Sequence, residues 1–88
     1  SDAAELPALD GAKLANYDKK GVKGVEISNV KSGSMAAQRG LKDGDVIIGV
    51  NRQVVENTQD LRKILEQKPS AVALNILRGN SNFYLLVQ

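Results

Sequence analysis

The sequence contains no cysteine, no histidine and no tryptophan. Without cysteine there is no disulfide framework, and the redox compartment is not revealed. Without histidine, a Ser-His-Asp or Cys-His catalytic arrangement is impossible, and so is a histidine-based zinc site. A serine–lysine dyad stays open on residue types alone, but the serines and lysines fall in turns or polar stretches and no nucleophile-elbow pattern is present. We therefore expect a chain that is not an enzyme and that needs no cofactor and no metal.

Long apolar runs and a strong excess of one charge are also missing. No run approaches the roughly 18 apolar residues that cross a bilayer, and there is no signal-peptide pattern. Twelve basic and ten acidic residues are interleaved and give a formal net charge of +2, which argues against a nucleic-acid partner. The apolar fraction of 42% is that of a globular protein. The 88 residues predict one small domain.

The stretch from residue 33 to residue 51, GSMAAQRGLKDGDVIIGVN, organises the rest of the chain. Ser34 can accept a hydrogen bond from the free N–H groups of a following turn, so it is predicted to cap a short helix. Gly40 supplies the left-handed residue that commonly ends a helix, and Gly44 gives the next turn its positive φ. The apolar run over residues 46–48 then predicts a strand that is covered on both faces.

The residues before this stretch predict a lead-in and a first strand. Residues 1–8, SDAAELPA, contain one proline and are interpreted as a mobile linker or a remnant of expression. This favours a fragment of a longer protein over a chain that is soluble alone. The domain itself is expected to span residues 9–88. A loop with a glycine opens a strand over residues 12–15, and a polar loop is expected over residues 16–21.

A second strand is predicted over residues 24–30. Its first half alternates strictly, with Val25 and Ile27 pointing inward and the polar residues between and after them pointing outward. Val30 falls on the opposite parity, which predicts a bulge or a strand end near Asn29.

A helix follows the central stretch. Residues 52–53 are expected to form a tight turn and residues 54–55 a very short strand. Asn57 is a plausible N-cap, because its side chain can bond the free N–H groups of the first turn. The predicted helix covers residues 58–67, and Pro69 ends it.

The end of the sequence predicts a hairpin. Residues 71–77 alternate as in a half-buried strand, Gly79-Asn80 is a short turn, and residues 83–87 return antiparallel. Phe83 and Tyr84 then point to opposite faces, so that one packs inside and the other offers a contact surface. Together the elements predict an α+β fold, a partly open antiparallel barrel of five to six short strands capped by two helices.

The central stretch also carries a family resemblance. Its run AAQRGLKDGDVIIGVN resembles the signature G-S-P-A-A-x-A-G-L-x-x-G-D-x-I-x-x-V/I-N of PDZ domains in bacterial HtrA (Deg) serine proteases. The resemblance covers the chain from about Leu9 to Gln88 and is greatest to the second, C-terminal PDZ domain of the DegP/DegQ branch. Met35 stands where the signature usually has proline, which should slightly loosen the start of the helix.

The resemblance implies a site that binds peptide C-termini by strand addition, with a glycine-bearing loop that turns its N–H groups toward the terminal carboxylate. The corresponding parts of this chain are the loop Leu9–Ala12, an edge strand over residues 12–15 and the helix over residues 58–67. The candidate peptide-binding residues are Leu9, Asp10, Gly11, Ala12, Lys13, Leu14, Leu61, Ile64 and Leu65.

Several of these residues have a second interpretation. Asp10 would repel a terminal carboxylate if it pointed into the loop, whereas an Asp-Gly pair is also ordinary turn chemistry. Leu61, Ile64 and Leu65 form one helical stripe and serve the core; Leu61 and Ile64 are expected to border the groove and Leu65 to be buried. Lys13 belongs either to a solvated face or to a field that attracts carboxylates.

The resemblance implies a periplasmic location and leaves two functions open. One is the capture of peptide C-termini or unfolded segments by strand addition. The other is assembly, through contacts with protease or PDZ domains of the same oligomer. The hypothesis combines assembly with weak peptide binding, and its alternative is a regulatory or C-terminal-peptide-binding PDZ module of a protease or secretion component.

Overall fold

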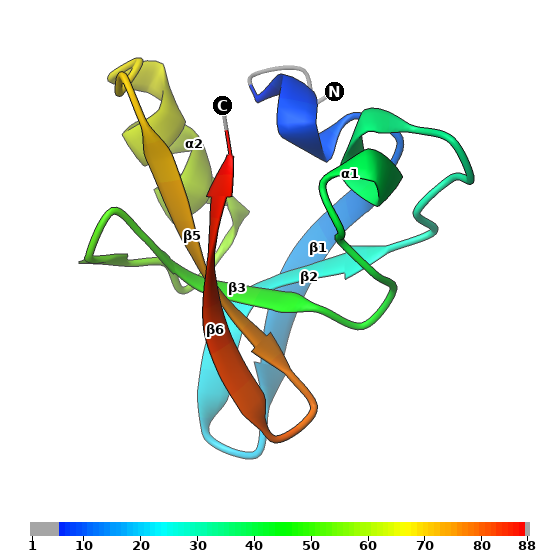
Figure 1. The fold of residues 1–88 in the computed structure, drawn as a ribbon. Coiled ribbons are helices and arrows are strands. Elements are labelled where there is room, and N and C mark those ends of the chain that lie inside the picture. Colours follow the sequence, from blue (N-terminus) through cyan, green and yellow to red (C-terminus); the bar gives the residue numbers. More distant parts are fainter. Residues whose placement is uncertain (1–5, 88) are drawn as a thin grey trace.

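The computed structural model describes residues 6–87. Its elements follow one another along the chain as shown in Figure 1. They are a 3₁₀ helix η2 (Pro7–Leu9), strands β1 (Lys13–Lys19) and β2 (Val22–Ser28), helix α1 (Met35–Gln38), strands β3 (Val46–Val50) and β4 (Gln53–Val54), helix α2 (Thr58–Glu66), and strands β5 (Val72–Arg78) and β6 (Ser81–Val87).

The six strands form one antiparallel sheet in the order β1-β2-β3-β5-β6, with β4 paired to β3. The sheet is strongly twisted, and the helices lie near one end of it (Figure 1). Strands β1 and β6 are its two edges. The predicted fold class, with six short strands and two helices, is confirmed.

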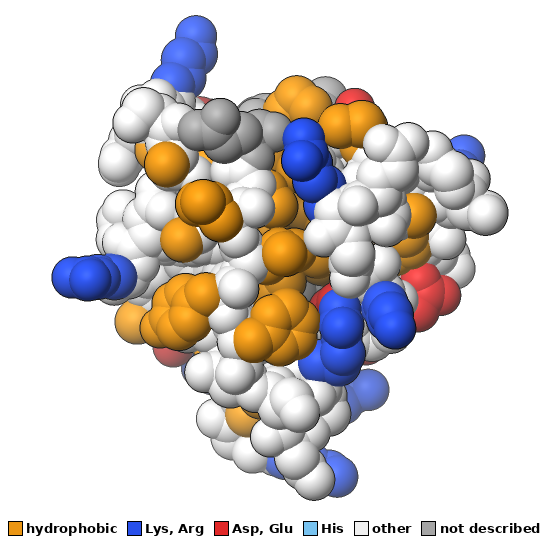
Figure 2. Space-filling view, viewed as in Figure 1, with side chains coloured by type: hydrophobic (Ala, Val, Ile, Leu, Met, Phe, Trp, Pro, Cys, Tyr) orange, Lys and Arg blue, Asp and Glu red, His pale blue; other side chains and the backbone are white. Residues whose placement is uncertain are grey.

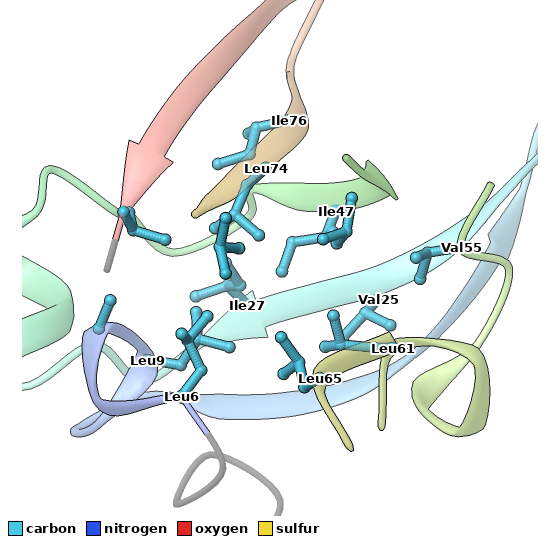
Figure 3. Close-up of a cluster of buried hydrophobic side chains, with 14 of the residues drawn as sticks. Leu6, Leu9, Val25, Ile27, Ile47, Val55, Leu61, Leu65, Leu74 and Ile76 are labelled. Atoms are coloured by element: carbon cyan, nitrogen blue, oxygen red, sulfur yellow. The ribbon is translucent and has the colours of Figure 1, made fainter. Parts of the chain in front are cut away.

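One hydrophobic core joins the sheet to the helices (Figure 3). Alternate residues of β2 and β5 supply much of it, because successive strand residues point to opposite faces. Val25 and Ile27 are fully buried, as predicted. The other large, fully buried apolar side chains are Leu9, Ile47, Val50, Val55, Leu74, Ile76 and Val87.

The central stretch folds as its sequence indicates. Ser34 Oγ accepts a hydrogen bond from the N–H of Ala37 at 3.2 Å, which is an N-cap. Gly40 has φ of 91° and Gly44 has φ of 92°, so both turns use the conformation that glycine adopts freely. Strand β3 is buried apart from the half-buried Ile48. A side chain at Gly24 would collide with β3, so that glycine lets the two strands cross.

Three predicted segments differ from the structure. The polar loop over residues 16–21 is wrong, because β1 continues to Lys19 and only Lys20 and Gly21 form the turn. Their φ values of 54° and 77° are those of a type I′ hairpin turn, whose twist suits antiparallel strands. The positions along this hairpin are mostly exposed and therefore polar, so that the strand has the composition of a loop.

The short strand and its turn are displaced by one residue. The turn is Asn51-Arg52, with φ of 51° and 69°, and β4 is Gln53–Val54. A shift of one residue exchanges the two faces of a strand. Accordingly, Val54 is exposed, whereas Val55 is buried beyond the end of the strand.

The lead-in is shorter than expected. Leu6 and Ala8 are buried in the core beside Leu9, which a mobile segment over residues 1–8 would not allow. The proline starts a 3₁₀ turn that fixes these apolar side chains against the sheet. Residues 1–5 lie outside the described residues, and a domain limit at residue 9 stays a prediction.

Candidate functional site

Strand β1 offers an unpaired edge that faces helix α2. It pairs with β2 on one side, and Lys19 and Val22 are the pair that closes the hairpin. The pair that closes a two-residue hairpin turn exchanges its hydrogen bonds, and the pattern alternates from there. The N–H and C=O groups of Leu14 and Asn16 therefore point away from β2. The predicted edge strand is present and longer than expected.

The loop Leu9–Ala12 before β1 is fixed in place by hydrogen bonds that its carbonyl groups accept from other parts of the chain. The N–H of Ala36 donates to Asp10 O at 3.0 Å, and the N–H of Lys31 donates to Gly11 O at 2.8 Å. Because a trans peptide places its C=O and N–H on opposite sides, the N–H groups of Gly11 and Ala12 point away from these donors. Within residues 6–87, the Ala12 N–H donates a hydrogen bond to Leu9 O at 3.3 Å inside the same loop.

Glycine is required in this loop. Gly11 has φ of 94°, and a Cβ there would overlap the side chain of Ser34. Ser34 is also the N-cap of α1, so the loop rests directly on the start of that helix. The arrangement fixes two neighbouring N–H groups on one backbone segment, and the Ala12 group also donates within the loop. Successive N–H groups of this kind suit a carboxylate.

The structure brings the apolar candidates together. Leu9, Leu61, Ile64 and Leu65 are buried in the core, and Ala12 and Leu14 pack partly buried against it. Leu65 is buried as expected; Leu61 and Ile64 are equally buried, so their place at the border of a groove stays a prediction. Asp10 and Lys13 are exposed.

Helix α2 is capped independently of the strand. Asn57 Oδ1 accepts from the N–H of Asp60 at 2.8 Å, and Asp60 Oδ2 accepts from the N–H of Glu56 at 3.0 Å. This confirms the predicted N-cap. The helix ends at Glu66, followed by Lys68 with φ of 51° and then Pro69, as the predicted proline stop requires.

A second exposed surface lies on the opposite side of the sheet from α2. Tyr84 is 64% exposed and Leu86 is 69% exposed, both on edge strand β6, and Val54 on β4 is 72% exposed. Phe83 packs inward instead, so the predicted division between the two rings is confirmed. Figure 2 shows hydrophobic side chains gathered on the face that carries β6, with Lys and Arg beside them.

This second surface is hollowed. A depression of about 220 Å³ lies between β3, β4 and the ring of Tyr84. Its lining residues are Ile48, Gly49, Arg52, Gln53, Val54, Asn75 and Tyr84. Isolated exposed apolar residues are common on proteins, but several large ones around a hollow indicate a contact surface.

One partly buried ion pair was not predicted from the sequence. Asp45 is fully buried and accepts two hydrogen bonds of 2.7 Å from Arg78, as well as one of 3.0 Å from the N–H of Lys42. Arg78 also donates to Gly40 O and stacks on the ring of Phe83. The hydrogen bonds that Arg78 donates to Asp45 raise the pKa of the Arg78 guanidinium. The pair fastens β5 to the turn after α1.

No group of potential metal ligands occurs within residues 6–87. None of the helices in that range has the length and apolar character needed to cross a membrane.

Comparison with known sequences identifies several relatives. The profile of the PDZ domain family matches residues 2–77. A probable periplasmic serine protease do/HhoA-like of Haemophilus influenzae is 68% identical over 88 residues, which is 100% of this chain and 19% of that protein. Periplasmic serine endoprotease DegP of Escherichia coli K12 is 55% identical over 80 residues, 91% of this chain and 16% of DegP. Periplasmic pH-dependent serine endoprotease DegQ of the same organism is 50% identical over 91 residues, 100% of this chain and 20% of DegQ.

Solved structures share the fold. The HtrA3 PDZ domain bound to a phage-derived ligand (FGRWV) superposes with a TM-score of 0.72 at 22% identity, covering 88% of this chain and 79% of that one. The PDZ domain of EpsC from Vibrio cholerae gives a TM-score of 0.67 at 17% identity, covering 91% and 95%. The chain itself spans about a fifth or less of the length of the curated relatives it matches.

Proposed function

Because this chain belongs to the PDZ domain family, we propose that it is a non-catalytic binding module of a periplasmic HtrA-type serine protease. The relatives named above are periplasmic serine proteases, and the chain corresponds to only 16–20% of their length. The protease domain is therefore not part of this chain. Two observations support two activities for the module.

The first proposed activity is weak capture of peptide C-termini or unfolded segments by strand addition. The observation that carries it is the combination of a free β1 edge with the Gly11 N–H at its start, next to the Ala12 N–H that donates to Leu9 O at 3.3 Å. An added strand would bond the free groups of Leu14 and, where it extends that far, those of Asn16, and its terminal carboxylate would meet the loop. The small side chain of Ala12 offers little apolar area to the last residue of a peptide, so a Kd on the order of 10⁻⁴ M or weaker is expected.

A titration monitored by NMR tests this activity. Peptides with an apolar last residue and a free carboxylate are expected to shift the backbone amides of residues 11–15 together with those of α2. The same peptide with an amidated end controls for contacts that do not involve the carboxylate. If neither peptide shifts these amides at millimolar concentration, peptide capture at this edge is excluded.

The second proposed activity is assembly of protease subunits through the surface formed by Tyr84, Leu86 and Val54. The observation that carries it is the exposure of these three large apolar side chains, two of which, Tyr84 and Val54, line the hollow. Burial of such side chains against a partner is favourable by about 25 cal/mol per Å² of apolar area. Tyrosine is moreover enriched among the hot-spot residues that contribute most of the binding energy of protein interfaces.

Assembly is tested in the intact protease of which this chain is a module. Replacement of Tyr84 and Leu86 by alanine is expected to shift sedimentation profiles toward smaller oligomers. Gln59→Ala, an exposed polar change on α2, is the matched control and should leave the profile unchanged. An unaltered profile for Tyr84→Ala/Leu86→Ala would assign the module to peptide binding or regulation alone.

A further inference from the structure

One hydrogen bond bridges the space between the free strand edge and α2. The N–H of Thr58, the first residue of α2, donates to Asn16 Oδ1 at 2.8 Å. Asn16 lies on β1, opposite Val25 of β2. The contact thus joins the exposed edge of the sheet to the start of the helix, two segments that are 42 residues apart in sequence.

The strand register places this bridge along the path of a bound peptide. Ala12, Leu14 and Asn16 are successive residues on the same face of the extended chain. In an antiparallel strand whose carboxylate meets Gly11, the last residue lies beside Ala12 and the third from last beside Leu14. The fifth from last then lies beside Asn16, where the side chain reaches over to α2.

We propose that the Asn16–Thr58 hydrogen bond closes the groove and limits it to about the last four residues of a C-terminal peptide. Longer peptides gain no contacts beyond that point while the bond is made. An internal segment of an unfolded chain, which must continue past both ends of the groove, binds only when the bond opens. This inference names the ligand length for the peptide-binding activity proposed above and rests on it.

The bond is weak enough to act as a latch and is not needed for folding. It is a neutral hydrogen bond at an exposed position, and such bonds contribute little net stability. The helix keeps its N-cap without it, because Asn57 and Asp60 satisfy the neighbouring N–H groups. Variants that lack the bond are therefore expected to fold normally.

Two variants remove the bond from opposite sides. Asn16→Ala removes the acceptor. Thr58→Pro removes the donor at the first helical position, where proline fits because its φ is preset. The preceding Asn57 is extended, with φ of −161° and ψ of 175°, as a residue before proline requires. Asn16→Asp keeps an acceptor oxygen next to a helix N-terminus and serves as the conservative variant.

The experiment compares a peptide of four residues with a peptide of eight residues. The two share the same last four residues, and both end in valine with a free carboxylate. In the unmodified protein their Kd values are expected to agree within about twofold. In Asn16→Ala and in Thr58→Pro the longer peptide is expected to bind about two- to tenfold more tightly, the range that loss of one such hydrogen bond allows. Asn16→Asp should behave as the unmodified protein does.

The outcomes separate this inference from the function on which it rests. If the short peptide binds all four proteins and the longer peptide shows the same ratio in each, the latch is refuted while peptide capture stands. The same conclusion follows if only one of the two bond-breaking variants responds to length. If neither peptide shifts the amides of β1 and α2 in any protein, both the latch and peptide capture are refuted.

Discussion

At the scale of single residues, Asp45 lies in a predicted turn, yet its side chain joins parts of the fold that are distant in sequence. Its carboxylate is fully buried and receives all three of its hydrogen bonds from within the fold, two from Arg78 and one from the N–H of Lys42. A Gly-Asp pair in a sequence indicates a turn, but it does not indicate which distant arginine will reach it. That partner follows only from the strand register that places Arg78 at the end of β5.

Removing this carboxylate should destabilise the domain. Asp45→Ala is expected to lower the free energy of unfolding by about 1.5–3 kcal/mol, a range that already allows for the 36% exposure of the Arg78 side chain. Asp43→Ala is the control, because Asp43 makes one exposed hydrogen bond, to the N–H of Val30, and should cost about 0.5–1.5 kcal/mol. Urea denaturation measures both. Equal losses would show that the buried pair is not a main constraint on β5.

The raised pKa of Arg78 fixes the sign of the pH dependence. A folded-state pKa above the unfolded value means that the folded protein holds the proton more tightly. The contribution of Arg78 is therefore fully present at any pH below the ordinary pKa of arginine and is lost only as the pH rises through the folded value. No weakening of the pair through Arg78 is expected in the neutral range.

Asp10 is the residue that should set the strength of peptide binding. It is exposed in the loop whose N–H groups would meet a carboxylate, and two like charges repel. Asp10→Asn keeps the turn chemistry and removes the charge, so a free-carboxylate peptide should bind more tightly and an amidated peptide should change little. The gain should shrink as salt is added. Titrations at two salt concentrations decide this; equal gains for both peptides would exclude a carboxylate near Asp10.

At the scale of elements, substitutions in β3 and at the outward positions of β2 should differ in how much they lower the free energy of unfolding. Ile47 is fully buried in β3, so Ile47→Ala should cost about 2–5 kcal/mol. Glu26 is half-buried on the outward parity of β2, and Glu26→Ala should cost no more than about 0.5 kcal/mol. Denaturant unfolding of both variants provides the measurement. Similar costs would contradict the strand register.

The elements that sequence could predict are those whose apolar residues face the core. Periodicity predicts α2, β5 and the inward residues Val25 and Ile27, because burial repeats with the period of the element. The continuous apolar run predicts β3 as a strand covered on both faces. Periodicity does not predict the second half of β1, because the exposed positions of the β1–β2 hairpin leave no apolar repeat. It also misplaces β4 by one residue, and a shift of one residue exchanges the two faces of a strand.

The candidate site was predictable only in outline. The family resemblance indicated the loop, the edge strand and the helix, and the structure places them together. It does not indicate the bond between Asn16 and Thr58, because the polar composition of residues 16–21 predicts a loop at Asn16. Contacts between residues far apart in sequence depend on register, which the local pattern does not specify.

At the scale of the whole molecule, the two proposed surfaces lie at opposite edges of one sheet. Strand β1 carries the peptide edge, and β6 carries Tyr84 and Leu86, with three strands between them in the sheet order. Substitutions at distant sites without shared partners are usually additive. The two activities should therefore be separable by mutation.

The prediction is that Tyr84→Ala/Leu86→Ala leaves peptide binding unchanged. Both side chains are mostly exposed, so the variant should unfold within about 0.5 kcal/mol per substitution of the unmodified domain, and the Kd of a C-terminal peptide should stay within about twofold. Conversely, Asn16→Ala should alter the dependence on peptide length and leave the oligomer profile of the intact protease as it was. Both variants are measured by peptide titration and by sedimentation, so that each substitution is tested for each of the two activities. A loss of peptide affinity in Tyr84→Ala/Leu86→Ala without a loss of stability would mean that the two edges are coupled through the sheet, because three strands separate β6 from β1 in the sheet order.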